Sequence, residues 1–248
     1  MENTAIRFAC NGCGVCCKGR LIPLTFNESR EWLKRGHDVA VILEAFDESL
    51  WPSEPEKFSH SAKRAAQIDS GNTKINVIAI FAANALTQCP NLDDQDRCGI
   101  YEERPLVCSI YPAEISPFIT LDPANKVCPP EVWEAGEIIV SDRVVDPAVR
   151  IKIAQSRDAD RLDAHAKVAI CESMDMTVAA WKENALAVYL PDRQKLMAAL
   201  DHYDSGIKRA AHTSWSVRIE DHELREKVRS SGVQVDTSES SSYIFHKL

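Results

Sequence analysis

The sequence predicts an α+β protein in which a small, irregular, metal-stabilised cysteine-cluster domain with short strands precedes a mostly helical C-terminal region. Two observations predict this. Eight of the nine cysteines occur at or before residue 128, whereas beyond about residue 146 cysteine nearly vanishes and apolar residues recur with helical spacing. We therefore expect a cysteine-cluster domain at 1–145, a helical region packing on it at 146–228, and a polar tail with a composition typical of disorder at 229–248.

A strand and a helix are the clearest elements outside the cysteines. Thr25 and Glu28 form a capping box, which predicts a helix at 26–35. The β-branched and aromatic residues of KINVIAIFA predict a buried strand at 74–82. The remaining expectations are strands at 21–24, 118–121 and 138–145, a loop at 51–59, and helices at 147–173, 176–189 and 191–204.

Composition and charge disfavour two classes of partner. Acidic residues outnumber basic ones by 37 to 29, giving a formal net charge of -8, so no nucleic-acid partner is expected. The start, MENTAIRFAC, lacks a secretory pattern. The longest apolar run, at 75–86, is interrupted by two asparagines and is too short to span a bilayer. These features predict a cytoplasmic protein with no membrane partner.

Metal binding is the favoured explanation for the clustered thiols. Cytoplasmic thiols stay reduced, and an odd total of nine does not fit a complete disulfide framework. Two alternatives are a thiol–disulfide exchange site, since C-x-x-C is also that spacing, and a set of unligated core cysteines. The lone Cys171, on an expected helix, is predicted to be a small buried hydrophobe.

The first cysteine cluster, FACNGCGVCCKG, contains two C-x-x-C steps and one further adjacent thiol. Its glycines allow positive φ values, so the loop can fold tightly and direct several sulfurs at a common centre. The second cluster begins at Cys89, and its acidic residues predict a tight polar loop that ends at Cys98. Pro105 is then expected to begin a short helix that carries Cys108 and ends near Pro112.

An iron–sulfur cluster, of the 4Fe–4S type, is the favoured centre. Cys10, Cys13 and Cys16 have the C-x2-C-x2-C spacing of a ferredoxin run, whose fourth thiolate often precedes a proline. Two Cys-Pro pairs are present, at 89–90 and 128–129. The match is partial, because the next cysteine of a ferredoxin run would fall where an arginine stands.

Zinc is the alternative centre. C-x-x-C steps begin many structural zinc sites, and here Cys10 and Cys13 would pair with two later thiols. Eight thiols suffice for two sites, so one or two metal centres are expected. Cys16 and Cys17 diverge in extended backbone and need not bind the same ion. The excess negative charge of such a centre would be offset by nearby basic residues, namely Lys18, Arg20, Arg97 and Arg104.

The segments CNGCGVCC and CPNLDDQDRCGIYEERPLVCSIYP together resemble the bacterial CxxCxxCC (YkgJ-like) family of cysteine-cluster proteins, described as zinc- or iron-chelating. The resemblance covers roughly residues 5–130. It implies a metal-binding set of Cys10, Cys13, Cys16, Cys17, Cys89, Cys98 and Cys108, to which we add Cys128. It also singles out Tyr101, Glu102, Arg104, Pro105, Tyr111 and Pro112. We expect these residues to start the helix and to pack in the core. The alternative is a direct role at the site, with Arg104 donating to a sulfur or to a loop carbonyl and the tyrosines forming aromatic walls.

The function predicted is that of a metalloprotein with redox or electron-transfer activity, and an oxidoreductase if it is an enzyme. No Ser-His-Asp set or phosphate loop is visible. One alternative is a structural zinc module that docks a protein partner. Another is an S-adenosylmethionine-dependent protein lysine methylase, since flagellin N-methylases carry a similar cysteine cluster, although no glycine-rich G-x-G loop is present. Catalytic residues, substrate and oligomeric state are left open.

Overall fold

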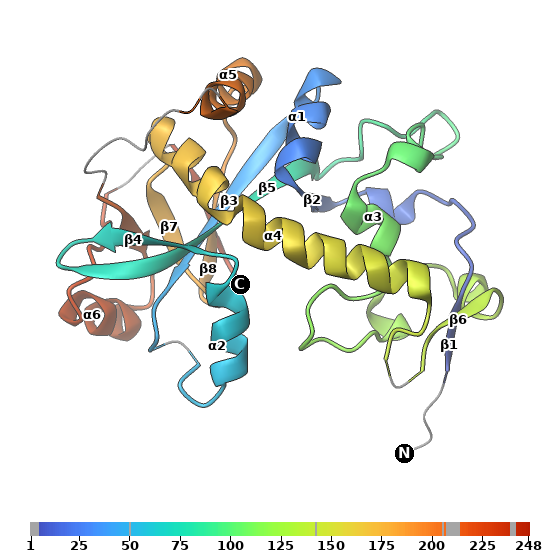
Figure 1. The fold of residues 1–248 in the computed structure, drawn as a ribbon, viewed down its shortest axis with the longest axis horizontal. Coiled ribbons are helices and arrows are strands. Elements are labelled where there is room, and N and C mark those ends of the chain that lie inside the picture. The colour runs from blue at the N-terminus through green and yellow to red at the C-terminus, as the bar shows by residue number, and fades with distance from the viewer. Residues whose placement is uncertain (1–4, 50, 142, 205, 207–213, 239–241) are drawn as a thin grey trace. The chain divides into compact units, whose positions relative to one another are not determined.

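A computed structural model describes residues 5–49, 51–141, 143–204, 206, 214–238 and 242–248 (Figure 1). Helices and mixed sheets occur together, which confirms the α+β class. The chain forms two compact units. The first comprises Met1–Thr25 and Ala83–Ala159, and the second comprises Phe26–Ala82 and Asp160–Leu248. These units alternate along the chain, unlike the contiguous segments 1–145, 146–228 and 229–248, whose boundaries stay predictions.

The first unit is built from short elements. Strand β1 (Ile6–Phe8) pairs antiparallel with β6 (Glu137–Val140). Helix α3 (Leu106–Ile110) contacts strand β2 (Arg20–Leu24). The other elements are 3-10 helices η1 (Val15–Cys17), η2 (Tyr101–Glu103), η3 (Pro123–Asn125) and η4 (Pro130–Trp133), together with the first part of α4 (Pro147–Ser173).

Two small apolar clusters support this first unit. One is centred on Ile110, Ala113 and Ile153, and anchors the end of α3. The other contains Leu121 and the buried residues of β6, against which β1 packs. Such small clusters supply little burial energy, so a unit of this kind commonly relies on an additional cross-link such as a bound metal.

The second unit is a mixed sheet with helices. Strand β3 (Val39–Phe46) is buried along its whole length. It pairs antiparallel with β8 (Ala185–Tyr189) and parallel with β7 (Val178–Trp181), as can be followed in Figure 1. The remaining strands are β4 (Ala66–Ser70), β5 (Thr73–Ala85, its last residues in the first unit), β9 (Ser216–Arg218) and β10 (Ile244–Lys247). The helices are α1 (Phe26–Lys34), α2 (Pro55–Ala62), the second part of α4, α5 (Arg193–Asp204) and α6 (His222–Ser230).

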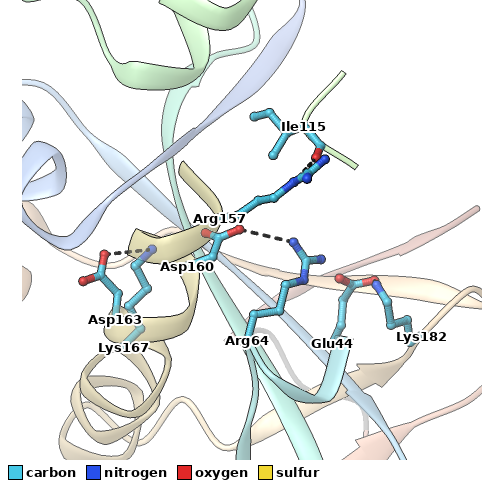
Figure 2. A network of polar contacts seen from close by, with 8 residues as sticks. All are labelled: Glu44, Arg64, Ile115, Arg157, Asp160, Asp163, Lys167 and Lys182. Carbon is cyan, nitrogen blue, oxygen red and sulfur yellow. Dashed lines mark hydrogen bonds and ion pairs between the residues drawn. The ribbon is translucent and has the colours of Figure 1, made fainter. Parts of the chain in front are cut away.

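Ion pairs accompany the buried charges of the second unit (Figure 2). Lys182 donates to the carboxylate of Glu44, an almost fully buried residue of β3, at 2.7 Å. Asp163 lies 3.9 Å from the buried ammonium group of Lys167, whose pKa is lowered by burial. Since an unpaired buried charge is strongly destabilising, these two pairs stabilise the burial of Glu44 on the sheet and of Lys167 on α4. Arg64 and Asp160 form a further, more exposed pair at 3.3 Å.

Several predicted elements are confirmed. The helix expected at 26–35 is α1, the helix expected at 147–173 is α4, and the helix expected at 191–204 is α5. The strand expected at 21–24 is β2, and KINVIAIFA lies within β5. None of the helices in the described part of the chain is both long and apolar enough to cross a membrane.

The helix predicted at 176–189 is wrong, because this segment forms β7 and β8. The two strands are joined by a turn in which Glu183 has a φ of 65°. Both strands pair with β3, and the Tyr189 hydroxyl donates to the Val178 carbonyl at 2.8 Å. Tertiary pairing with a buried strand therefore overrides the helical spacing of the sequence.

Four other expectations differ from the structure. Within the loop expected at 51–59, Pro55 begins α2, which is the helix position that proline favours. Residues 118–121 are fully described and form no strand. The strand expected at 138–145 ends at Val140. In the segment 229–248, predicted as a polar tail, residues Ile244–Lys247 form β10 and pair with β8.

Helix α5 offers a test of core packing. Leu196 is fully buried on α5, whereas Leu162 on α4 is 81% exposed. We expect Leu196→Ala to lower the free energy of unfolding by about 2–5 kcal/mol, because it leaves a cavity. The control Leu162→Ala should change it by no more than about 0.5 kcal/mol. Urea unfolding followed by tryptophan fluorescence measures both, and equal effects would contradict the described core.

Candidate metal centre

The first cysteine loop turns at glycines and a short 3-10 helix. Gly12 and Gly14 have φ values of 72° and 69°, a region that favours glycine. The Cys17 amide donates to the Gly14 carbonyl at 2.9 Å and so closes the turn η1. This turn places the thiols of Cys16 and Cys17 3.9 Å apart. The tight fold predicted from the glycines is therefore present.

Three contacts join this loop to the second cysteine cluster within the first unit. The Cys89 amide donates to the Cys17 carbonyl at 2.7 Å. Lys18 forms an ion pair of 2.7 Å with Asp96. The backbones also approach closely, since a Cβ added to Gly14 would lie 2.3 Å from the Asp96 carbonyl oxygen. Two cysteine clusters that are far apart in sequence are thus held together by backbone.

The loop between Cys89 and Cys98 is ordered by its own polar groups. The Asp93 carboxylate accepts hydrogen bonds from the backbone amides of residues 95 and 97, at 2.9 and 2.8 Å. These amide donors, with that of Arg97 the strongest, lower the pKa of Asp93. Leu92 and Cys98 form an antiparallel bridge that closes the loop. The tight polar loop predicted from the acidic residues is confirmed.

All eight predicted ligand residues belong to the first unit. Cys108 lies on α3, Cys128 lies between η3 and η4, and Cys89 is buried. Cys171 belongs to the second unit and is fully buried on α4, which confirms its prediction as a core residue. The remaining ligand candidates range from half-buried to exposed and comprise Cys10, Cys13, Cys16, Cys17 and Cys98.

The thiols lie close enough to influence one another electrostatically. A hydrogen bond from the Cys17 thiol, aided by the charges of Arg20 and Arg104, lowers the pKa of Cys16 to about 6. The same hydrogen bond and burial raise the pKa of Cys17, as do the nearby thiolate charges of Cys89 and Cys108. Cys16 is therefore a thiolate at neutral pH, which is the form that binds metal.

The pKa shifts of Cys89 and Cys128 identify which other thiols lie near each of them. Burial raises the pKa of Cys89, and the charge of Cys98 adds to this. Burial also raises the pKa of Cys128. The thiolate charges of three cysteines in the first loop, at residues 16, 13 and 10, raise it further. Each of the eight thiols is thus within electrostatic range of at least one other.

The thiols are neighbours without forming a closed ligand sphere. None of the nine cysteines forms a disulfide. Among the residues that the structure describes, no three His, Cys, Asp or Glu side chains converge in an arrangement able to hold a metal ion. Thiolate side chains repel one another, so a common centre requires a cation to draw them together. The ligand set stays a prediction, supported by the proximity of the two clusters.

Basic and aromatic side chains surround the thiols. Arg104 lies over the ring of Tyr101 at 3.7 Å and donates a hydrogen bond to the Tyr101 carbonyl. Of its two expected roles, it therefore has that of a donor to a loop carbonyl. Arg20 lies over the ring of Tyr111 at 5.7 Å. Its Nε is buried and has no hydrogen-bond partner within the described residues. The Lys126 ammonium also lies over Tyr111, a contact that sequence reasoning missed because only the folded chain brings residues 111 and 126 together.

Comparison with known proteins identifies the class of this domain. Residues 9–129 match the model of the CxxCxxCC family, described as a "Putative zinc- or iron-chelating domain". The cysteine-rich part of the chain is thus similar to this family, and the resemblance predicted from the motifs is confirmed. Neither a curated protein nor a solved structure matches the chain.

A pair of glycine variants tests the contact between the two loops. Both Gly12→Ala and Gly14→Ala place a Cβ at positive φ, which costs about 1–2 kcal/mol. Only Gly14→Ala also drives that Cβ into the Asp96 carbonyl, since nothing lies within 4 Å of the position at Gly12. We expect Gly14→Ala to be the more destabilised variant in urea unfolding and the faster cleaved near residue 14 in limited proteolysis. Identical behaviour of the two variants would contradict the close approach.

The lowered pKa of Cys16 predicts selective alkylation. In chelator-treated protein, the rate at which Cys16 reacts with iodoacetamide should rise with pH around a midpoint near 6, because the thiolate is the nucleophile. Replacing the hydrogen-bond donor by Cys17→Ala should move this midpoint upward, whereas Cys17→Ser retains a donor and should move it less. Mass spectrometry of tryptic peptides measures the rates. An unchanged midpoint in Cys17→Ala would contradict the stated cause.

Proposed function

We propose that the first unit binds soft metal through thiolates drawn from both cysteine clusters. The observation that carries this proposal is the 2.7 Å hydrogen bond from the Cys89 amide to the Cys17 carbonyl. It holds the two thiol-bearing loops against each other before any metal is considered. Binding of a common ion then requires the thiol side chains of both loops to turn toward it on this backbone.

The donor chemistry of the first unit fits a thiolate-ligated centre. The candidate ligands are all sulfur, the donor that favours zinc and iron–sulfur clusters. Cys16 is already ionised at neutral pH. The buried Nε of Arg20 has no hydrogen-bond partner in the described part of the chain, and the charge of this guanidinium group acts on Cys16. A sulfur-ligated anionic centre would give this buried donor an acceptor.

The neighbours of each thiol support two ligand sets. The charges that act on Cys128 come from the three cysteines with ferredoxin spacing. Those that act on Cys17 include Cys89 and Cys108, and Cys98 acts in turn on Cys89, while Cys16 acts on both Cys17 and Cys89 and so lies between the two sets. We assign Cys10, Cys13, Cys16 and Cys128 to one centre and Cys17, Cys89, Cys98 and Cys108 to the other. The adjacent Cys16 and Cys17 are then divided between the two centres, although the 3-10 turn brings their thiols to 3.9 Å instead of directing them apart as in extended backbone.

The first of these sets is suited to an iron–sulfur cluster. It combines the C-x2-C-x2-C spacing with a Cys-Pro ligand at 128–129. When bound, such a cluster supplies one-electron transfer, so the proposed activity is redox or electron transfer in the cytoplasm. The chain's own contribution is to provide the four thiolates, to bury part of the centre and to place Arg20 beside its negative charge.

A structural zinc centre is the second candidate function. The apolar clusters of the first unit are small. A zinc ion held by four thiolates would contribute folding energy directly. In this case the first unit would be a scaffold for binding a protein partner, and metal removal would unfold it without any redox change.

Metal content distinguishes the two candidates. Protein purified without oxygen should contain iron and inorganic sulfide in similar amounts and show visible absorption that bleaches on reduction. Cys171→Ala serves as the matched control, because this cysteine belongs to the second unit, and it should retain the full metal content. Zinc alone would overturn the iron–sulfur version, and protein without bound metal would overturn the whole proposal.

The two ligand sets can be separated by single substitutions. We expect Cys128→Ala to lose the iron–sulfur absorption, because it removes the ligand assigned to that cluster. Cys108→Ala should retain the absorption, because it affects only the other set. Iron, sulfide and zinc are measured in both variants. Loss of iron to the same extent in both variants would contradict the division into two sets.

A further inference from the structure

Tyr111 is fixed beside one of the proposed ligands. In the structure the Cys128 thiol donates a hydrogen bond to the Tyr111 hydroxyl oxygen at 3.4 Å. The Tyr111 amide donates to the Val107 carbonyl at 3.1 Å, which fixes the residue at the end of α3. The neighbouring Ile110 is buried in the apolar cluster of the first unit. The Tyr111 ring is therefore held at the end of α3, beside the segment that carries Cys128.

Two cations from other segments hold the ring in place. Arg20, the first residue of β2, lies over it at 5.7 Å, and Lys126 lies over it at 5.4 Å. Lys126 is itself fixed by a 2.5 Å ion pair with Glu114, and both side chains are largely buried. Cations over an aromatic face draw electron density from the ring, which strengthens its hydroxyl as a hydrogen-bond donor. Two separate segments, β2 and residues 126–128, thus converge on one phenol.

Metal coordination decides the direction of the hydrogen bond to Cys128. A coordinating cysteine is a thiolate and has no proton to donate, so its partner must be the donor. The phenol is the one group of this pair that then carries a proton. Hydrogen bonds to ligand sulfurs orient these ligands and tune the metal. In iron–sulfur centres they also affect the reduction potential.

We propose that Tyr111 is a positioning residue of the metal centre, whose hydroxyl donates to the sulfur of Cys128 when this cysteine binds metal. The inference rests on the proposed function in one respect, namely that Cys128 is a ligand. It adds that the centre has a built outer shell, in which Arg20 and Lys126 hold the phenol. The aromatic wall expected from the family motif thereby acquires a specific polar role.

The test compares two tyrosine variants in the full chain. Tyr111→Phe removes only the hydroxyl group. Tyr101→Phe is the control, because Tyr101 also lies under an arginine but is exposed and has no described contact with a cysteine sulfur. Chelator-stripped protein is titrated with Co²⁺, whose thiolate charge-transfer absorption reports sulfur ligation. We expect Tyr111→Phe to bind Co²⁺ about 10–100-fold more weakly and with a shifted band, and Tyr101→Phe to behave as wild type.

A double-mutant cycle shows whether Tyr111 acts through Cys128. In the Cys128→Ala background, Tyr111→Phe should cause no further change in Co²⁺ affinity, because the acceptor sulfur is gone. Equal effects of Tyr111→Phe in both backgrounds would overturn the proposal and indicate a packing role. An unaltered affinity and band in the single variant would also overturn it, while leaving the metal-binding function intact. If the wild-type chain shows no thiolate band with Co²⁺, both the inference and the proposed function fail.

Discussion

The contact between two cysteine loops is the constraint on which the first unit depends. The Cys89 amide bonds to the Cys17 carbonyl, and Gly14 allows the backbone at Asp96 to approach where no side chain would fit. Both are backbone features, so they fix the loops irrespective of how the thiol side chains are turned. The distance between the clusters is consequently a property of the fold. This makes one joint metal centre, or two adjacent ones, a more economical explanation than separate sites.

Electrostatics explains why the thiols need a cation. Each neighbouring thiolate contributes to raising the pKa of Cys89, Cys128 or Cys17, in addition to the effect of burial. Cys16 is the exception, because the hydrogen bond from Cys17 and two arginines favour its ionised form. A metal ion would reverse the unfavourable interactions, since the same closeness that makes thiolates repel one another allows them to share a cation.

Much of the site was predictable because its information is local. The glycines of the first loop, the acidic loop before Cys98 and the helix after Pro105 depend on neighbours in sequence, and each is confirmed. The strands β7 and β8 were missed because they are stabilised by pairing with β3. The residues within 176–189 carry no local signal of that pairing.

The polar surroundings of the thiols illustrate the limit most clearly. The family motif singles out Tyr111 but carries no signal for its partners. Arg20 reaches Tyr111 from β2, and Lys126 reaches it from a later segment. Such contacts between residues distant in sequence become visible only when the chain is folded.

The most direct test of the central claim is to map which thiols metal protects. The full chain, with metal bound and after chelator treatment, is alkylated and each cysteine is quantified by mass spectrometry. The account predicts that cysteines of both clusters, in 10–17 and in 89–108, lose reactivity together when metal is bound, while the buried Cys171 does not change. Protection confined to the first loop would contradict a site closed by the second cluster.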